Sequence, residues 1–148
     1  MIVSIANIGT EINSIISKTK EIPKISEQEK INNFLDSFNA FKTKLSDRVE
    51  KIKQLEKLFT DITWLDLKNQ EEEELLKDVI HRSKLFYSKS IKDVAYLRTK
   101  YWRKNMFRSE ITEYQICLED FEDTIFEVEE IFFSLRKDDE FNDLTNSL

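Results

Sequence analysis

The chain has 148 residues and a formal net charge of −6, and 35% of its residues are charged. This length corresponds to one domain with room for a substantial core. A single glycine and a single proline are far fewer than the average shares of about 7% and 5%. Because strand-rich folds need both residues in their turns, we predict an almost wholly helical chain.

The sequence also bears on the cellular location of the protein. No apolar run approaches the roughly 18 residues of a membrane-spanning helix, and the apolar start of the chain lacks the basic residues and the cleavage site of a signal peptide. The single cysteine, Cys117, excludes an intrachain disulfide and is typical of a reducing compartment. We therefore expect a cytoplasmic protein with no membrane partner.

The first predicted element is a short helix within residues 1–22. Isoleucines recur there at positions 5, 8, 12 and 15, with the three- and four-residue spacing of one helix face. Gly9 lowers the stability of such a helix by up to about 1 kcal/mol relative to alanine. We predict that this helix completes a bundle with the longer helices that follow.

A long helix is predicted over residues 26–66. Ser26 and Glu29 form the pattern of a capping box shortly after Pro23. An apolar seam with helical spacing follows, through Ile31, Phe34, Phe38, Phe41, Leu45, Ile52, Leu55, Phe59 and Ile62. Arg48 is the only charged residue on this seam.

A third helix is predicted over residues 70–104. The acids Glu71 to Glu74 fall in its first turn, where the helix dipole favours negative charge. Its seam is less regular and runs through Leu76, Val79, Ser83, Phe86, Ile91, Val94, Leu97 and Tyr101. The phase changes between Phe86 and Ile91, and Ser90 also occupies a seam-like position, so we expect a stutter or a kink there.

The last helix is predicted over residues 109–137, with Ser109 as its N-cap and a polar tail at 138–148. Its seam is an unbroken series of three- and four-residue steps through Ile111, Tyr114, Leu118, Phe121, Ile125, Val128, Phe132 and Leu135. Such a seam packs a helix at a shallow angle against its neighbours. The four segments together predict an all-α fold: one helical domain, built as an elongated antiparallel three- to four-helix bundle with coiled-coil-like seams.

Charge is strongly sorted along the chain. Residues 82–108 hold nine basic residues and one acid, a local charge of +8, whereas residues 109–148 hold two basic residues and thirteen acids, a local charge of −11. The basic stretch must be neutralised either by the chain's own acidic helix or by an outside anion. An antiparallel hairpin would bring it beside Glu110, Glu113 and Glu119, and we expect this intramolecular pairing.

Motifs for catalysis and metal binding are missing from the sequence. His81 is the only histidine, whereas a ferritin-like carboxylate site needs the Glu-x-x-His pattern twice. The calcium-binding loop, the P-loop, the dinucleotide glycine motif and zinc-ligand spacing are also absent. Cys117 lies next to acids, which raise the pKa of a thiol. We expect a protein that is not an enzyme and that takes no metal, cofactor or small-molecule substrate.

Two groups of residues remain as candidates for binding. Phe126 and Phe133 stand seven residues apart, one position after seam residues, and Trp64 is also off the seam. These side chains either pack on the N-terminal helix or bind another protein. The second group lies in the basic-aromatic stretch and consists of Arg98, Lys100, Tyr101, Trp102, Arg103, Lys104 and Arg108. Cations that follow a backbone, beside rings that stack on bases, suit single-stranded nucleic acid.

The preferred interpretation is a non-catalytic helical accessory subunit that binds another protein or a second copy of itself. An immunity or inhibitor protein, or a structural component of a larger complex, is of this kind. The alternative is a small helical subunit of a nucleoprotein complex that contacts RNA or single-stranded DNA through residues 82–108. Fold class alone does not decide between them.

Overall fold

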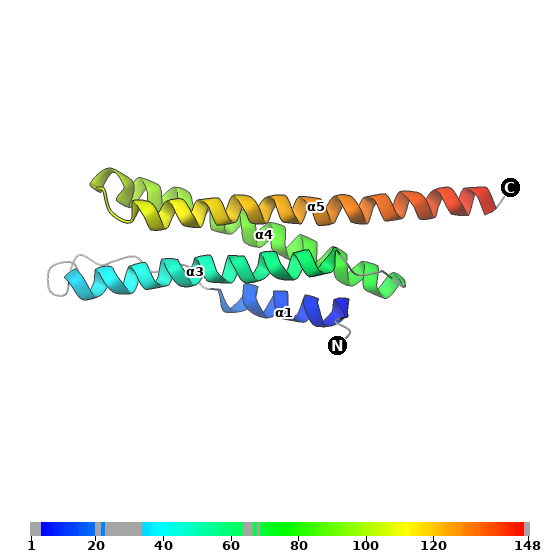
Figure 1. Cartoon of the computed structure of the whole chain (residues 1–148), viewed down its shortest axis with the longest axis horizontal. Coiled ribbons are helices and arrows are strands. Elements are labelled where there is room, and N and C mark those ends of the chain that lie inside the picture. Colours follow the sequence, from blue (N-terminus) through cyan, green and yellow to red (C-terminus); the bar gives the residue numbers. More distant parts are fainter. Residues whose placement is uncertain (1–3, 20–21, 23–33, 64–66, 68, 147–148) are drawn as a thin grey trace.

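The computed structural model describes residues 4–19, 22, 34–63, 67 and 69–146. In this part of the chain the regular structure is entirely helical and comprises α1 (Ile5–Lys18), α3 (Phe34–Ile62), α4 (Gln70–Tyr101), the short 3-10 helix η1 (Trp102–Lys104) and α5 (Arg108–Asn146). The α-helices lie side by side in an elongated bundle (Figure 1), which confirms the predicted all-α bundle. The capping box at Ser26 and the side chain of Trp64 lie outside the described residues.

Short polar side chains cap the amino ends of α1 and α4. The Ser4 hydroxyl accepts a hydrogen bond from the Asn7 amide (3.3 Å), and the Asn69 side-chain oxygen accepts one from the Glu72 amide (2.9 Å). Each cap satisfies an amide that has no partner within its helix. α4 accordingly begins at Gln70, with three glutamates in its first turn, where the dipole favours them.

The turn between α4 and α5 is held by one buried aromatic ring. Asn105 and Phe107 both have a φ of 57°, in the left-handed region that asparagine tolerates and that costs a bulky residue about 1–2 kcal/mol. The Phe107 side chain is buried, with ring centroids 4.5 Å from Phe38, 4.7 Å from Phe41 and 5.3 Å from Tyr101. These ring contacts offset the backbone strain and tie the turn to α3 and α4.

α5 differs from its predicted bounds at both ends. The Ile111 amide donates to the Phe107 carbonyl oxygen (2.8 Å), so Phe107, and not Ser109, holds the N-cap position. The strained turn at Phe107 directs the chain into the helix one residue earlier than predicted. At the other end α5 continues to Asn146. The helix therefore continues past its predicted end at residue 137, because no glycine or proline interrupts it there.

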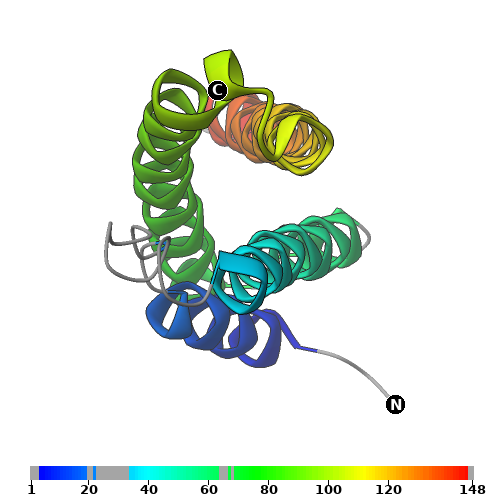
Figure 2. The same ribbon diagram turned by 90° about the vertical axis from the view of Figure 1, so that its left-hand side faces the viewer.

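Seen along its axis, the bundle places the helices at four corners in the order α1, α3, α5, α4 (Figure 2). Consecutive helices run in opposite directions (Figure 1). α3 and α4 lie across a diagonal rather than side by side, so the neighbours α3 and α5 are parallel, as are α1 and α4. The short helix α1 contacts both α3 and α4, so the N-terminal helix completes a four-helix bundle.

The predicted seams form the core. On α5 the buried residues include Ile111, Tyr114, Leu118, Phe121, Ile125, Val128 and Phe132, and on α3 they include Phe41, Leu45, Ile52, Leu55, Phe59 and Ile62. Phe121 makes edge-on ring contacts with Phe59 of α3 (5.5 Å) and Phe86 of α4 (6.4 Å). One side chain of α5 thereby joins three helices.

The seam of α4 passes through its serines. Ser83 and Ser90 are buried, whereas Ile91 is only half-buried. The seam therefore runs from Phe86 through Ser90 to Val94 in two successive four-residue steps, and this break in the alternation of three and four is the predicted stutter, centred on Ser90 instead of Ile91. α4 continues as one helix through this stretch, so the pattern that suggested a kink marks polar residues placed in the core.

Gly9 lets α1 and α4 approach each other closely. The glycine is buried, and a β-carbon built there would lie 3.1 Å from Cγ2 of Val79, closer than an ordinary van der Waals contact. Val79 is 1% exposed and β-branched, so its side chain has little freedom to turn away. The glycine weakens α1 as an isolated helix but permits its close packing on α4.

We expect Gly9→Ala to lower the free energy of unfolding, because overpacking costs about 1–3 kcal/mol and outweighs a gain in helix propensity of roughly 1 kcal/mol. The double variant Gly9→Ala/Val79→Ala should lose less than the sum of the two single losses, since truncation of Val79 removes the contacted methyl group. Chemical denaturation of wild type and the three variants measures this coupling. Additive losses would show that the two helices do not meet at Gly9.

Candidate functional site

Phe126 and Phe133 lie exposed on the outer side of α5, with 59% and 53% of their surface accessible. α1 sits diagonally across the bundle from α5 (Figure 2), so these rings do not pack on the N-terminal helix. Beyond them α5 extends past the ends of α3 and α4 (Figure 1). We refer to Phe126 and Phe133, which are two helical turns apart, as the α5 apolar strip.

A groove of about 390 Å³ runs between α4 and α5 beside Phe126. Its acidic residues include Glu122 and Glu129, and its basic residue, Lys84, forms an ion pair with Glu129. Burial, together with the carboxylate of Glu122, raises the pKa of Tyr87 in this groove to about 12. The groove therefore presents negative charge next to an apolar ring.

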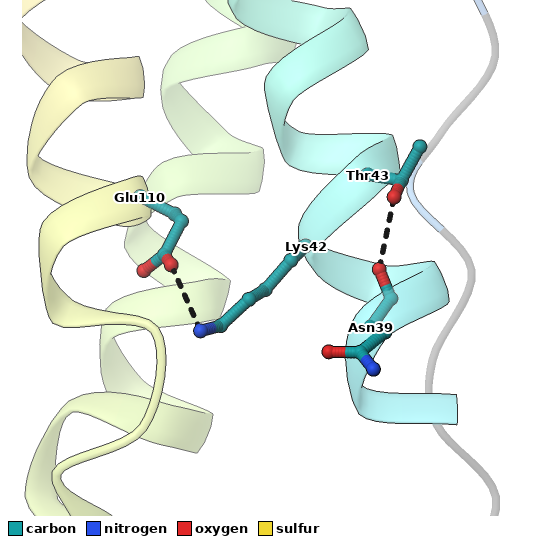
Figure 3. Close-up of polar contacts among 4 residues, drawn as sticks. All are labelled: Asn39, Lys42, Thr43 and Glu110. Atoms are coloured by element: carbon teal, nitrogen blue, oxygen red, sulfur yellow. Dashed lines mark hydrogen bonds and ion pairs between the residues drawn. The ribbon is translucent and has the colours of Figure 1, made fainter. Parts of the chain in front are cut away.

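The acids at the start of α5 pair with α3 rather than with the basic stretch. Lys42 Nζ lies 3.5 Å from Glu110 Oε1 (Figure 3), and Lys53 Nζ lies 3.8 Å from Glu113 Oε1. The predicted pairing with the end of the basic stretch is therefore wrong for Glu110 and Glu113, although Lys84, at the start of that stretch, does pair with Glu129 of α5. The reason is the helix order, because α3 lies parallel to α5 and brings its own lysines to this side.

The basic end of the bundle surrounds Trp102. The Arg98 guanidinium lies over the Trp102 ring at 4.8 Å and donates a hydrogen bond to Gln115 Oε1 (2.8 Å). Arg108 lies over the same ring at 5.3 Å and donates from Nε to the Trp102 carbonyl oxygen (3.1 Å). Cation–π contacts with two guanidinium groups thus engage this ring within the protein.

Three further cations, Lys100, Arg103 and Lys104, are exposed at this end and form no ion pair with a described residue. Tyr101 is 1% exposed and belongs to the core, so it is unavailable to a nucleic acid, contrary to its place in the sequence-based set. Of the two rings in that set, Tyr101 is buried and Trp102 is half-buried and already in contact with two guanidinium groups. The basic end is suited to phosphate contacts by charge alone.

Chemically reactive side chains are scattered over the bundle. Burial raises the pKa of the Cys117 thiol, against a smaller opposing effect of Lys53, so the group stays protonated and unreactive at neutral pH. His81 is exposed on α4. Across the described ranges, no three His, Cys, Asp or Glu side chains are grouped to hold a metal ion, and no helix has the length and apolar character of a membrane span.

Buried polar side chains lie on three of the seams. Arg48 of α3 is 7% exposed, and Ser90 of α4 and Tyr114 of α5 are also buried. Burial raises the pKa of Tyr114 to about 12, and its hydroxyl has no hydrogen-bond partner among the described residues. Arg48 and Ser90 line one cavity. The sequence marked Arg48 and Ser90 as separate irregularities of two seams. Their proximity depends on the helix order, which the seams do not reveal.

Comparison of the chain with protein-family models, with curated proteins and with solved structures finds no match. The candidate surfaces are therefore distinguished by their geometry and charge alone.

We expect the Arg98→Glu/Arg103→Glu/Lys104→Glu variant to lose no more than about 1 kcal/mol of stability, because exposed charge contacts contribute at most about that much. The matched variant Lys42→Glu/Lys53→Glu brings like charges beside Glu110 and Glu113. It should lose more stability, and the loss should be larger at low salt than at high salt. Urea denaturation at two salt concentrations compares the variants. A greater loss of stability in the triple variant than in the matched variant would show that the end of the basic stretch does pair with the acidic helix.

Proposed function

We propose that the protein is a non-catalytic interaction subunit that binds its partner through the α5 apolar strip. The observation that supports this most directly is the exposure of Phe126 and Phe133 on the helix that also provides the central seam of the core. Two apolar side chains two turns apart on one helix match the spacing at which a partner helix or groove takes up anchoring residues. Apolar surface left exposed in this way is typical of interaction sites.

The charge around the strip favours a basic partner. Residues 109–148 carry thirteen acids and two basic residues, and Glu122 and Glu129 line the groove beside Phe126. Symmetric self-association through α5 would bring like charges together and is disfavoured. A helix with an apolar face flanked by lysines or arginines complements both the rings and the groove.

We expect Phe126→Ser/Phe133→Ser to keep the melting temperature within roughly 2 °C of the wild-type value, because substitutions at exposed positions usually change stability little. The same variant should lose binding to a synthetic amphipathic Leu/Lys helix, measured by fluorescence anisotropy. A Leu/Glu helix with the same apolar face should bind neither protein. A large fall in melting temperature would place the two rings in the core instead.

The control for this experiment is Ile116→Ser, which removes a comparably exposed residue (51%) elsewhere on α5 and should keep binding. Equal binding by wild type and the double variant would exclude the strip as the partner site. Light scattering over a concentration series separates a foreign partner from a second copy. A wild-type dimer that the double variant cannot form would assign the strip to self-association.

A nucleoprotein subunit is the second candidate, and the exposed cations Lys100, Arg103 and Lys104 favour it. If nucleic acid is the ligand, Arg103→Glu/Lys104→Glu should abolish binding of a single-stranded oligonucleotide, and wild-type affinity should fall steeply with salt as counterions are released. Because Trp102 is engaged by two guanidinium groups, we expect little quenching of its fluorescence. Absence of wild-type binding at physiological salt would remove this candidate.

A further inference from the structure

A cavity of about 290 Å³, partly open to solvent, lies between α1, α3 and α4. It reaches inward to the polar residues of the core. Its apolar lining includes Ile16, Leu85 and Phe86, and its polar lining includes Asn13, Arg48 and Ser90. Residues of three different helices thus line one site, and they include both apolar and polar side chains.

Arg48 is the unusual residue of this lining. Its side chain is more than nine-tenths buried, yet it forms no hydrogen bond or ion pair with any described residue. Burying a charged group without a partner is costly, so buried arginines are normally paired. Asn13 adds an enclosed polar atom, because its Oδ1 is buried without a hydrogen-bond partner in the described chain, whereas the Arg48 nitrogens are not among such enclosed atoms. Both face a cavity from which a ligand would reach them.

The other charges around the cavity favour an anion. Arg82 and Lys89 line its α4 side, and Asp93 is the one acid among the described lining residues. Arg82 is paired with Asp78 at 3.0 Å, and Lys89 and Asp93 each have an interaction of their own. The lining is therefore net positive, and the positive charge deepest in the site belongs to Arg48.

We propose that this cavity binds a small organic oxyanion, a carboxylate or a phosphate monoester, with its anionic group on Arg48. The planar fork of a guanidinium matches the oxygens of either group. The apolar body of the ligand would lie against Ile16, Leu85 and Phe86. The volume is at the lower end of the roughly 300–1,000 Å³ of small-molecule sites, which limits the ligand to one ring or a short chain.

Binding at this site would run against the sequence-based expectation that the chain takes no small molecule, and it implies a ligand but no reaction. It is independent of the proposed partner binding, because it lies on α1, α3 and α4 whereas the apolar strip lies on α5. A ligand held there would connect α1 to the two helices that it contacts.

The test is thermal unfolding of the full chain with inorganic phosphate, benzoate or phenyl phosphate at constant ionic strength. We expect the organic anions to raise the melting temperature saturably, by roughly 4 °C at a tenfold excess over Kd. The larger of the benzoate and phenyl phosphate shifts identifies the preferred head group. Inorganic phosphate should act more weakly because it has no apolar body.

Arg48→Met should weaken binding roughly tenfold or more, Arg48→Lys should keep part of it, and the remote control Arg103→Met should bind like wild type. Because the guanidinium has no partner in the described chain, Arg48→Met should not lower the ligand-free melting temperature.

If Arg48→Met does not fold, a pair of variants at the rim of the cavity tests the proposal instead. Leu85 is 58% exposed, so Leu85→Glu should repel the anion while Leu85→Gln should not. The proposal fails if no probe shifts wild type, or if Arg48→Met or Leu85→Glu gains the same shift as wild type.

Discussion

The bundle depends on α5 burying one unbroken apolar seam between α3 and α4. α3 and α4 lie across a diagonal, so they are joined through α5 on one side and through the much shorter α1 on the other. Phe121 is at the centre of this arrangement, with its ring against Phe59 and Phe86. Phe107 sets where α5 begins, because its buried ring holds a backbone conformation that a bulky residue otherwise avoids. The rotation of α5 about its own axis is thereby determined.

That rotation decides which α5 side chains face outward and which acids find a partner. Phe126 and Phe133 follow seam residues by one position, which turns them to the outer side. Glu110 and Glu113 face α3 and pair with its lysines, so these two acids do not neutralise the cations at the end of α4. Exposed pairs of this kind add little to stability. The segregated charge therefore matters mainly for association, with an acidic groove along α5 and a cationic end at the α4–α5 turn.

The same packing places polar groups in the core. Ser83 and Ser90 of α4, Arg48 of α3 and Tyr114 of α5 are all buried, and Arg48 and Ser90 line the same cavity. An apolar residue at position 48 would complete the α3 seam, and a buried unpaired guanidinium costs stability. The bundle keeps the arginine next to a cavity that α1 closes on its third side. This cavity and the apolar strip use different helices, so each can be altered without the other.

Local spacing in the sequence determined the helical fold, the seam residues and the start of α4, because helix periodicity and capping are properties of neighbouring residues. It also singled out Arg48 and the off-seam rings Phe126 and Phe133 without assigning their surroundings. The tertiary structure alone decided that α3 and α5 are parallel neighbours, that Lys42 and Lys53 take the acids expected for the basic stretch, and that Tyr101 is a core residue. An a/d seam specifies which side of a helix is buried but not which helix covers it. Four similar seams are compatible with several helix orders, and only the packed bundle selects one.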